Sequence, residues 1–160
     1  MSKDKINNIF VSHYHSDAES IEGIKNLLNK KDIQARDSSI YEAKEKNNAN
    51  NPDYIKSLIR PQIQWAGTVI VLIGPKTSNS EWVNWEIEYA AEKGKRIIGV
   101  FLRGATESDI PEALKENGDA LVGWNADKIS QAMNGDDIWE QPDGTPHGNN
   151  PVNDMPRSTC

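Results

Sequence analysis

Short apolar runs alternate with amphipathic segments along this chain. The runs predict strands at residues 6–12, 33–36, 68–73, 96–102 and 120–123. The segments between them carry apolar residues at helical spacing and predict helices at residues 17–29, 53–65, 81–93, 107–116 and 125–133. Pro61 predicts a kink or a break in the second helix, and Pro111 breaks the start of the fourth. The alternation predicts an α/β three-layer sandwich, with a central, mostly parallel five-stranded sheet between two layers of helices.

The pattern is sharpest in residues 69–91, VIVLIGPKTSNSEWVNWEIEYAA. Its apolar run is rich in β-branched residues and is typical of a central strand covered on both faces. A polar loop follows, and a helix then runs to Lys93 and stops at Gly94. The loop offers four candidate N-cap residues: Thr77, Ser78, Asn79 and Ser80.

Glu86 lies one helical turn after Trp82, on the seam between the apolar face of this helix and the neighbouring face. One interpretation is an exposed acid near a helix N-terminus, where the helix dipole favours negative charge. The other is a carboxylate beside an indole at the mouth of a pocket. Ligands of parallel α/β sheets bind at the carboxyl ends of the strands, which is where this helix begins.

Composition narrows the choice of partners. The 160 residues suffice for one domain with a real core, and the formal net charge of −6 argues against a nonspecific nucleic-acid or anionic-membrane surface. No cleavable apolar segment opens the chain and no run approaches 18 apolar residues, so we expect a cytoplasmic protein without a nucleic-acid or membrane partner. The single cysteine, Cys160, cannot form an internal disulfide.

Two polar stretches stand out from the alternating pattern. Residues 37–51, DSSIYEAKEKNNANN, lack apolar periodicity and predict a long loop near a site. Residues 136–160 are dense in Pro, Gly, Asn and Asp and predict a C-terminal tail. Trp139 and Val152 could anchor it on the domain, and disorder or contact with a partner are the alternatives. The predicted organisation is therefore a domain at residues 1–135 and a tail at residues 136–160.

Two familiar chemistries fit the residues poorly. His13 and His15 followed by Asp17 resemble a metal motif of metallo-β-lactamase-type hydrolases, but zinc needs at least three protein ligands and Ala18 stands where that family has another histidine. We therefore predict no metal site. Ser12, His13 and Glu86 could mimic a nucleophile, a base and an orienting acid, yet adjacent residues rarely face each other and no nucleophile-elbow motif is present.

Three segments carry a resemblance to a known family. NIFVSHYHSD resembles the first strand and loop of TIR domains, LIGPKTSNSEWVNWEI resembles their third strand, loop and Trp-x-x-x-Glu helix start, and RIIGVFL resembles their fourth strand. The resemblance spans roughly residues 5–135 and is nearest to the TIR-like proteins of the bacterial Thoeris anti-phage system. It implies a TIR-like (flavodoxin-like) version of the predicted sandwich.

The resemblance also implies a reaction, cleavage of NAD+ at the nicotinamide–ribose bond, with Glu86 as the catalytic glutamate. One carboxylate can stabilise the oxocarbenium-like ribosyl cation, so NAD+ is a substrate and neither a metal nor a cofactor is needed. By the same matching, the substrate-binding residues are Ser12, His13, Tyr14, Asp37, Ser38 and Trp82. Trp82 could stack on nicotinamide or merely pack against the domain.

The implied partner is a separate effector protein that responds to an ADP-ribose-derived, often cyclic, product. Self-association and a phage-derived trigger are further expectations from the resemblance. The chain departs from typical TIR domains in its asparagine-rich loop and in His13-Tyr14, which replaces the usual arginine or aromatic residue. The alternative is a non-catalytic TIR adaptor that acts by self-association or partner binding, and both functions share one fold.

Overall fold

The structure is a computed structural model that describes residues 6–14, 20–31, 34–38 and 52–145. Its strands are β1 (Ile6–Ser12), β2 (Gln34–Ser38), β3 (Thr68–Ile73), β4 (Arg96–Phe101) and β5 (Ala120–Val122). Its helices are α1 (Ser20–Asn29), α3 (Pro52–Trp65), α4 (Glu81–Glu92), α5 (Glu112–Asn117) and α6 (Ala126–Met133), with 3-10 turns η2 (Thr77–Asn79) and η3 (Glu107–Asp109). The predicted alternation of strands and helices is confirmed.

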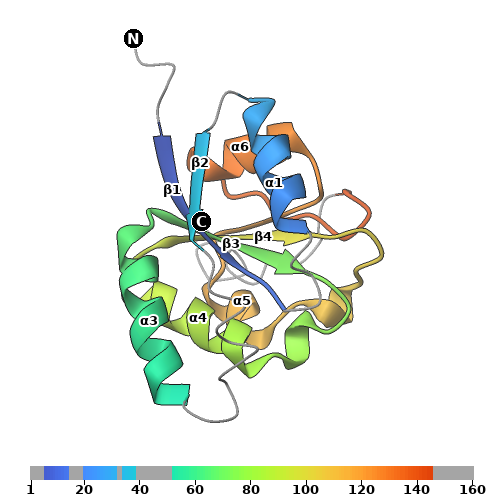
Figure 1. Ribbon diagram of the computed structural model, residues 1–160. Helices are drawn as coiled ribbons and strands as arrows, with labels where there is room; N and C mark the ends of the chain where they lie inside the picture. Colours follow the sequence, from blue (N-terminus) through green and yellow to red (C-terminus); the bar gives the residue numbers. More distant parts are fainter. Residues whose placement is uncertain (1–5, 15–19, 32–33, 39–51, 146–160) are drawn as a thin grey trace, which may run out of the picture.

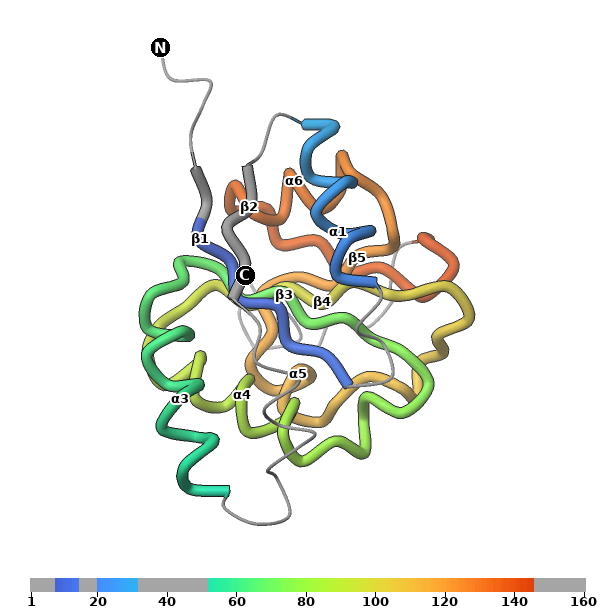
Figure 2. Tube along the Cα trace, in the orientation of Figure 1, coloured from blue at the N-terminus to red at the C-terminus, as the bar shows by residue number. Residues whose placement is uncertain are grey.

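The five strands form one parallel sheet in the order β2-β1-β3-β4-β5. Figure 1 shows α1 and α6 on one face of the sheet and α3, α4 and α5 on the other, so the predicted three-layer α/β sandwich is confirmed. The trace in Figure 2 follows β1 and β3 side by side through the middle of this sheet. All strands run the same way, so their carboxyl ends share one edge.

The position of β3 between two layers of helices accounts for the continuous apolar run in its sequence. Val69, Val71 and Ile73 pack in the core beneath α3, α4 and α5, whereas Ile70 and Leu72 pack in the core beneath α1 and α6. A strand with helices on both faces needs apolar side chains at successive positions, because each face buries alternate residues. The central position of this strand, between β1 and β4, agrees with the sequence prediction.

Some predicted boundaries differ from the observed ones. Strand β2 extends to Ser38, so Asp37 and Ser38 belong to a strand and not to the predicted loop, of which residues 39–51 lie outside the described residues. The break allowed for at Pro61 is absent, because α3 continues through this residue. Pro61 is exposed, and it removes only the helical bond to the Ser57 carbonyl while the apolar face of α3 stays buried.

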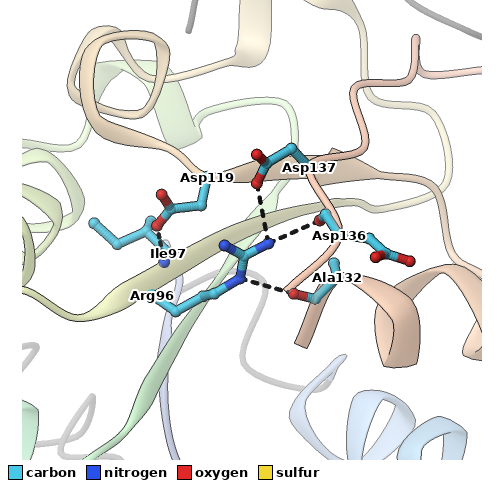
Figure 3. A network of polar contacts seen from close by, with 6 residues as sticks. All are labelled: Arg96, Ile97, Asp119, Ala132, Asp136 and Asp137. Atoms are coloured by element: carbon cyan, nitrogen blue, oxygen red, sulfur yellow. Dashed lines mark hydrogen bonds and ion pairs between the residues drawn. The ribbon is translucent and has the colours of Figure 1, made fainter. Parts of the chain in front are cut away.

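The chain after α6 continues along β5. The Leu121 backbone N–H donates to the Ile138 carbonyl at 2.7 Å, the Glu140 N–H donates back to the Leu121 carbonyl at 2.8 Å, and Trp139 is buried. Arg96 fixes the preceding turn by donating to the carbonyls of Ala132 and Asp136 at 2.8 and 2.7 Å (Figure 3). The described part of the predicted tail, to residue 145, therefore packs on the domain; residues 146–160, with Val152 and Cys160, lie outside the described residues.

Candidate functional site

Glu86 faces the interior of the domain. Of the four candidate caps, Ser80 caps helix α4: its hydroxyl accepts a hydrogen bond from the Val83 N–H at 3.1 Å. From this start, Val83, Glu86, Ile87 and Ala90 all lie on the buried side of the helix. Glu86 is 0% exposed, so the interpretation of an exposed helical acid is wrong.

Ser12 holds the carboxyl group of Glu86. Its hydroxyl donates to Oε1 of Glu86 at 2.6 Å, and Ser12 is also 0% exposed. The two residues are 74 positions apart, and the topology brings them together: Ser12 ends β1, β1 pairs with β3, and the segment after β3 leads into α4. A buried carboxyl group needs such partners, because its desolvation is costly unless hydrogen bonds replace water.

His13 and Tyr14 follow Ser12 out of the sheet. His13 is buried, and its Nδ1 lies 3.2 Å from the carbonyl oxygen of Val11. A carbonyl can only accept, so this contact requires a proton on Nδ1. The Ser12 hydroxyl donates to Glu86 and Nδ1 of His13 faces the carbonyl of Val11, so neither of these two contacts joins a serine nucleophile to a histidine base. Tyr14 is half-buried.

Trp82 lies in an aromatic row along α4. Its ring meets Trp85 edge-on at a centroid distance of 6.1 Å, and Trp85 stacks on Tyr89 at 5.6 Å. Two cations of α3 cover Trp85, with Lys56 Nζ and Arg60 Cζ 5.4 and 5.7 Å from the ring centroid. Trp82 and Trp85 also line a cavity of about 170 Å³ between α3 and α4. In this structure Trp82 therefore packs against Trp85.

The remaining predicted residues are placed by their backbone. Asp37 and Ser38 lie at the carboxyl end of β2, opposite Ile9 and Phe10 of β1. Strand β2 lies next to β1 in the sheet, so Asp37 and Ser38 lie at the same carboxyl edge as Ser12. His15, Ser16 and Asp17 of the histidine-rich loop lie outside the described residues.

Two further classes of site involve metal ions and membranes. Among residues 6–14, 20–31, 34–38 and 52–145, His, Cys, Asp and Glu side chains form no group of three that could hold a metal ion. None of the helices in these ranges is long and apolar enough to cross a membrane.

Comparison with known proteins identifies the family. The model of the Thoeris protein ThsB, TIR-like domain, matches residues 10–107, which is more than half of the chain. This chain belongs to the ThsB TIR-like domain family. The matched range begins in β1 and ends at the start of η3, and it contains Ser12 and Glu86. The resemblance to TIR-like proteins of the Thoeris system is thereby confirmed.

Two solved structures match this chain at low sequence identity. A conserved protein from Enterococcus faecalis V583 is 13% identical with a TM-score of 0.52, and the alignment covers 81% of this chain and 98% of that one. The CMP N-glycosidase BcmB from Clostridium botulinum is 17% identical with a TM-score of 0.49, with 79% and 98% covered. No curated protein matches this ThsB-type chain.

Sequence reasoning considered Ser12, His13 and Glu86 together as a candidate arrangement, but it did not predict the hydrogen bond from the serine to the glutamate. The Trp-x-x-x-Glu spacing identified the glutamate, and the resemblance to TIR domains at the end of the first predicted strand identified the serine. Nothing in either segment indicates that β1 and β3 are neighbours in the sheet, and this neighbour relation is what brings the two side chains to 2.6 Å. The missing signal is the strand order.

Proposed function

We propose that this protein is an NAD+-cleaving TIR enzyme, a glycohydrolase or ADP-ribosyl cyclase, that acts in the cytoplasm in anti-phage defence. Its product would be an ADP-ribose-derived nucleotide, cyclic in the preferred form of the proposal, that activates a separate effector protein. The observation that carries the proposal is the buried hydrogen bond from Ser12 to Glu86 at the carboxyl edge of the sheet. It lies inside the segment that matches the ThsB TIR-like domain.

In the proposed reaction, the main contribution of the protein is a negative charge held in a fixed position. The bond from C1 of the ribose to the nicotinamide nitrogen breaks, and nicotinamide leaves as a neutral molecule with the bonding electrons. The positive charge that develops at C1 is then stabilised by the carboxylate of Glu86. Attack by water gives ADP-ribose and a proton, whereas attack by a nucleophile within the same ADP-ribose gives a cyclic product and a proton.

Ser12 acts in this scheme as a positioning residue. By donating to Oε1, it holds one carboxylate oxygen and fixes the orientation of the other. A carboxylate fixed before the reaction needs no reorganisation when charge develops at the sugar. His13, Tyr14, Asp37, Ser38 and Trp82 remain the proposed substrate contacts; the first two follow β1, the next two end β2, and Trp82 lies on α4.

The burial of Glu86 has a consequence for regulation. A carboxylate with 0% exposure cannot touch a substrate until the groups that cover it move. This burial supports the proposal that the enzyme is inactive until a phage-derived trigger or self-association uncovers Glu86. The same burial favours the second candidate, a non-catalytic TIR adaptor, in which Glu86 only fastens α4 to β1.

Mass spectrometry of nucleotides separates the two candidates. Phage-challenged cells would express the wild-type chain, the Glu86→Gln variant, or Glu88→Gln as a matched control that changes an exposed glutamate of the same helix. We expect an NAD+-derived ADP-ribose species with the wild type and with Glu88→Gln, and at least about a hundredfold less with Glu86→Gln. Equal product levels, or no product from any variant across several phages, would support the adaptor.

A further inference from the structure

A cavity of about 630 Å³ lies at the carboxyl edge of the sheet, at the ends of β3, β4 and β5. Its lining includes Pro75, Leu102, Arg103, Trp124 and Pro142. This volume is in the range of small-molecule sites, which are about 300–1,000 Å³. The carboxyl edge is also where parallel α/β sheets bind ligands. Glu86 is not one of the lining residues, so the cavity is distinct from the site proposed above.

Trp124 gives the cavity an aromatic wall with a fixed position. It lies between the end of β5 and Asn125, which caps α6 by accepting from the Lys128 N–H at 3.0 Å. Its ring lies over Gly23 of α1, where an added Cβ would come within 3.1 Å of Cζ2 of the indole. A glycine inside a helix is normally unfavourable, and here it leaves room for the ring. Trp124 nevertheless remains 41% exposed, so part of the indole is available for contact.

Arg103 gives the cavity a cation. It lies in a turn closed by the Ala105 N–H donating to the Leu102 carbonyl at 3.1 Å, in which Gly104 has a φ of +86°. The Leu102 N–H in turn donates to the Ile73 carbonyl at 2.9 Å, which ties the turn to the end of β3. Within the described part of the chain, the Arg103 side chain forms no hydrogen bond or ion pair and is exposed. Its guanidinium is therefore available to an anion.

The indole of Trp124 and the guanidinium of Arg103 together indicate which class of ligand the cavity would bind. An indole with an open surface binds a flat aromatic ring, and a guanidinium binds a phosphate by two parallel hydrogen bonds. A free phosphate would fill only a small part of 630 Å³ and would leave the indole unused. Among the described residues that line the cavity, Arg103 is the only charged one, so the cavity carries a positive charge although the net charge of the chain is −6.

We propose that this cavity binds a nucleotide, with the base on the Trp124 indole and a phosphate on the Arg103 guanidinium. The proposal goes beyond the proposed function, since it requires no cleavage and no part of Glu86. A bound nucleotide would contact the segments after β3, β4 and β5 together. One of these, the segment after β3, leads into the helix that carries Glu86.

Titration by NMR with AMP, adenosine and ribose 5-phosphate tests each half of the ligand. AMP should shift the indole N–H signal of Trp124 and the amide signal of Gly104, and should bind at least about tenfold more tightly than either fragment. Arg103→Gln should reduce the affinity for AMP to that for adenosine. Trp124→Leu should reduce it to that for ribose 5-phosphate. Trp65→Leu and Lys115→Gln are matched controls at exposed positions and should bind AMP as the wild type does.

The outcomes separate this proposal from the proposed function. The proposal is overturned if AMP causes no shift at Trp124 and Gly104, or if Arg103→Gln and Trp124→Leu bind AMP as tightly as the wild type. Glu86→Gln should bind AMP as the wild type does. If the cavity binds AMP but the wild-type protein does not cleave NAD+, the cavity proposal holds and the enzyme proposal fails. Cleavage without AMP binding at the cavity would leave only the enzyme proposal.

Discussion

The carboxyl edge of the sheet has two polar features with opposite surroundings. At β1, Ser12 and Glu86 are fully buried and bonded to each other. At β4 and β5, Arg103 and Trp124 are exposed and line an open cavity. A buried carboxyl group must be held by the fold itself, and changing it affects stability and function together. Side chains around an open cavity contribute little to stability, so their presence needs a different explanation, such as a ligand.

The largest expected effect is on the buried pair. Glu86→Ala removes the acceptor of the Ser12 hydroxyl and leaves a cavity beneath α4, and we expect it to lower the free energy of unfolding by about 2–4 kcal/mol. Ser12→Ala should cost about 1.5–3 kcal/mol, since it removes a hydrogen bond to an acidic group. Urea denaturation of the single and double variants measures the coupling between the two residues, expected at about 1–3 kcal/mol.

The matched control for this cycle is Glu88→Ala, at an exposed position of the same helix, with an expected change within about 0.5 kcal/mol. If Glu86→Ala cost no more than Glu88→Ala, the carboxyl group would not be held in the interior. Additive costs for the Ser12 and Glu86 variants would show that their hydrogen bond contributes nothing in solution. Either result would contradict the difference between the buried Ser12–Glu86 pair and the exposed residues of the cavity.

The sequence predicts one of these features much better than the other. The Trp-x-x-x-Glu spacing and the apolar run before it are local patterns, so Glu86, its helix and the central strand β3 could be predicted from one contiguous segment. Its burial could not be predicted from the helical wheel alone, because Glu86 lies at the edge of the apolar face and β1 supplies the partner that stabilises it there.

The cavity at Trp124 could not be predicted because it is assembled from distant parts of the chain. Gly23, Arg103, Trp124 and Pro142 belong to four separate segments, and none forms a motif with its neighbours in sequence. The extension of the chain along β5 was also hard to predict. Residues 136–145 are polar and rich in turn formers, and only Trp139 signals that they pack on the domain. Local patterns predict elements, whereas contacts between elements depend on strand order.

A smaller effect is expected when the wall of the cavity is altered. Gly23→Ala places a Cβ about 3.1 Å from the Trp124 ring, which must move by a few tenths of an ångström. Because the indole is partly exposed and the helix gains about 0.5–1 kcal/mol from alanine, the net change in the free energy of unfolding should stay within about 1 kcal/mol. AMP binding should weaken and the Trp124 indole N–H signal should shift, while NAD+-derived product stays unchanged.

Gly67→Ala is the control for this variant, since an added Cβ there meets nothing within 4 Å. It should leave both the Trp124 signal and AMP binding unchanged. If Gly23→Ala did the same, the glycine would have no part in positioning the indole. If it abolished NAD+-derived product, the two ends of the sheet edge would be coupled and the contrast between them would fail.

The smallest expected effect concerns the ion pair that joins the turn after α1 to α6. Lys31 Nζ lies 2.7 Å from the Asp127 carboxylate. This hydrogen bond, followed by the charge of Lys31, lowers the pKa of Asp127 from its ordinary value of 3.8. A carboxyl group whose pKa is lower in the folded state stabilises the fold fully above its unfolded pKa, and this contribution is lost as the pH falls through the folded pKa.

Asp127→Asn should therefore destabilise the protein slightly at neutral pH, and the difference from the wild type should shrink as the pH falls below about 4. Thermal unfolding of both proteins across this pH range measures the difference, and high salt should reduce it at neutral pH because the pair is exposed. A difference that persisted in acid would assign the effect to the start of α6 instead of the ion pair. If Asp127→Asn also left AMP binding intact, the indole would be held by its contact with α1 at Gly23 and by its place between β5 and α6, without help from this pair.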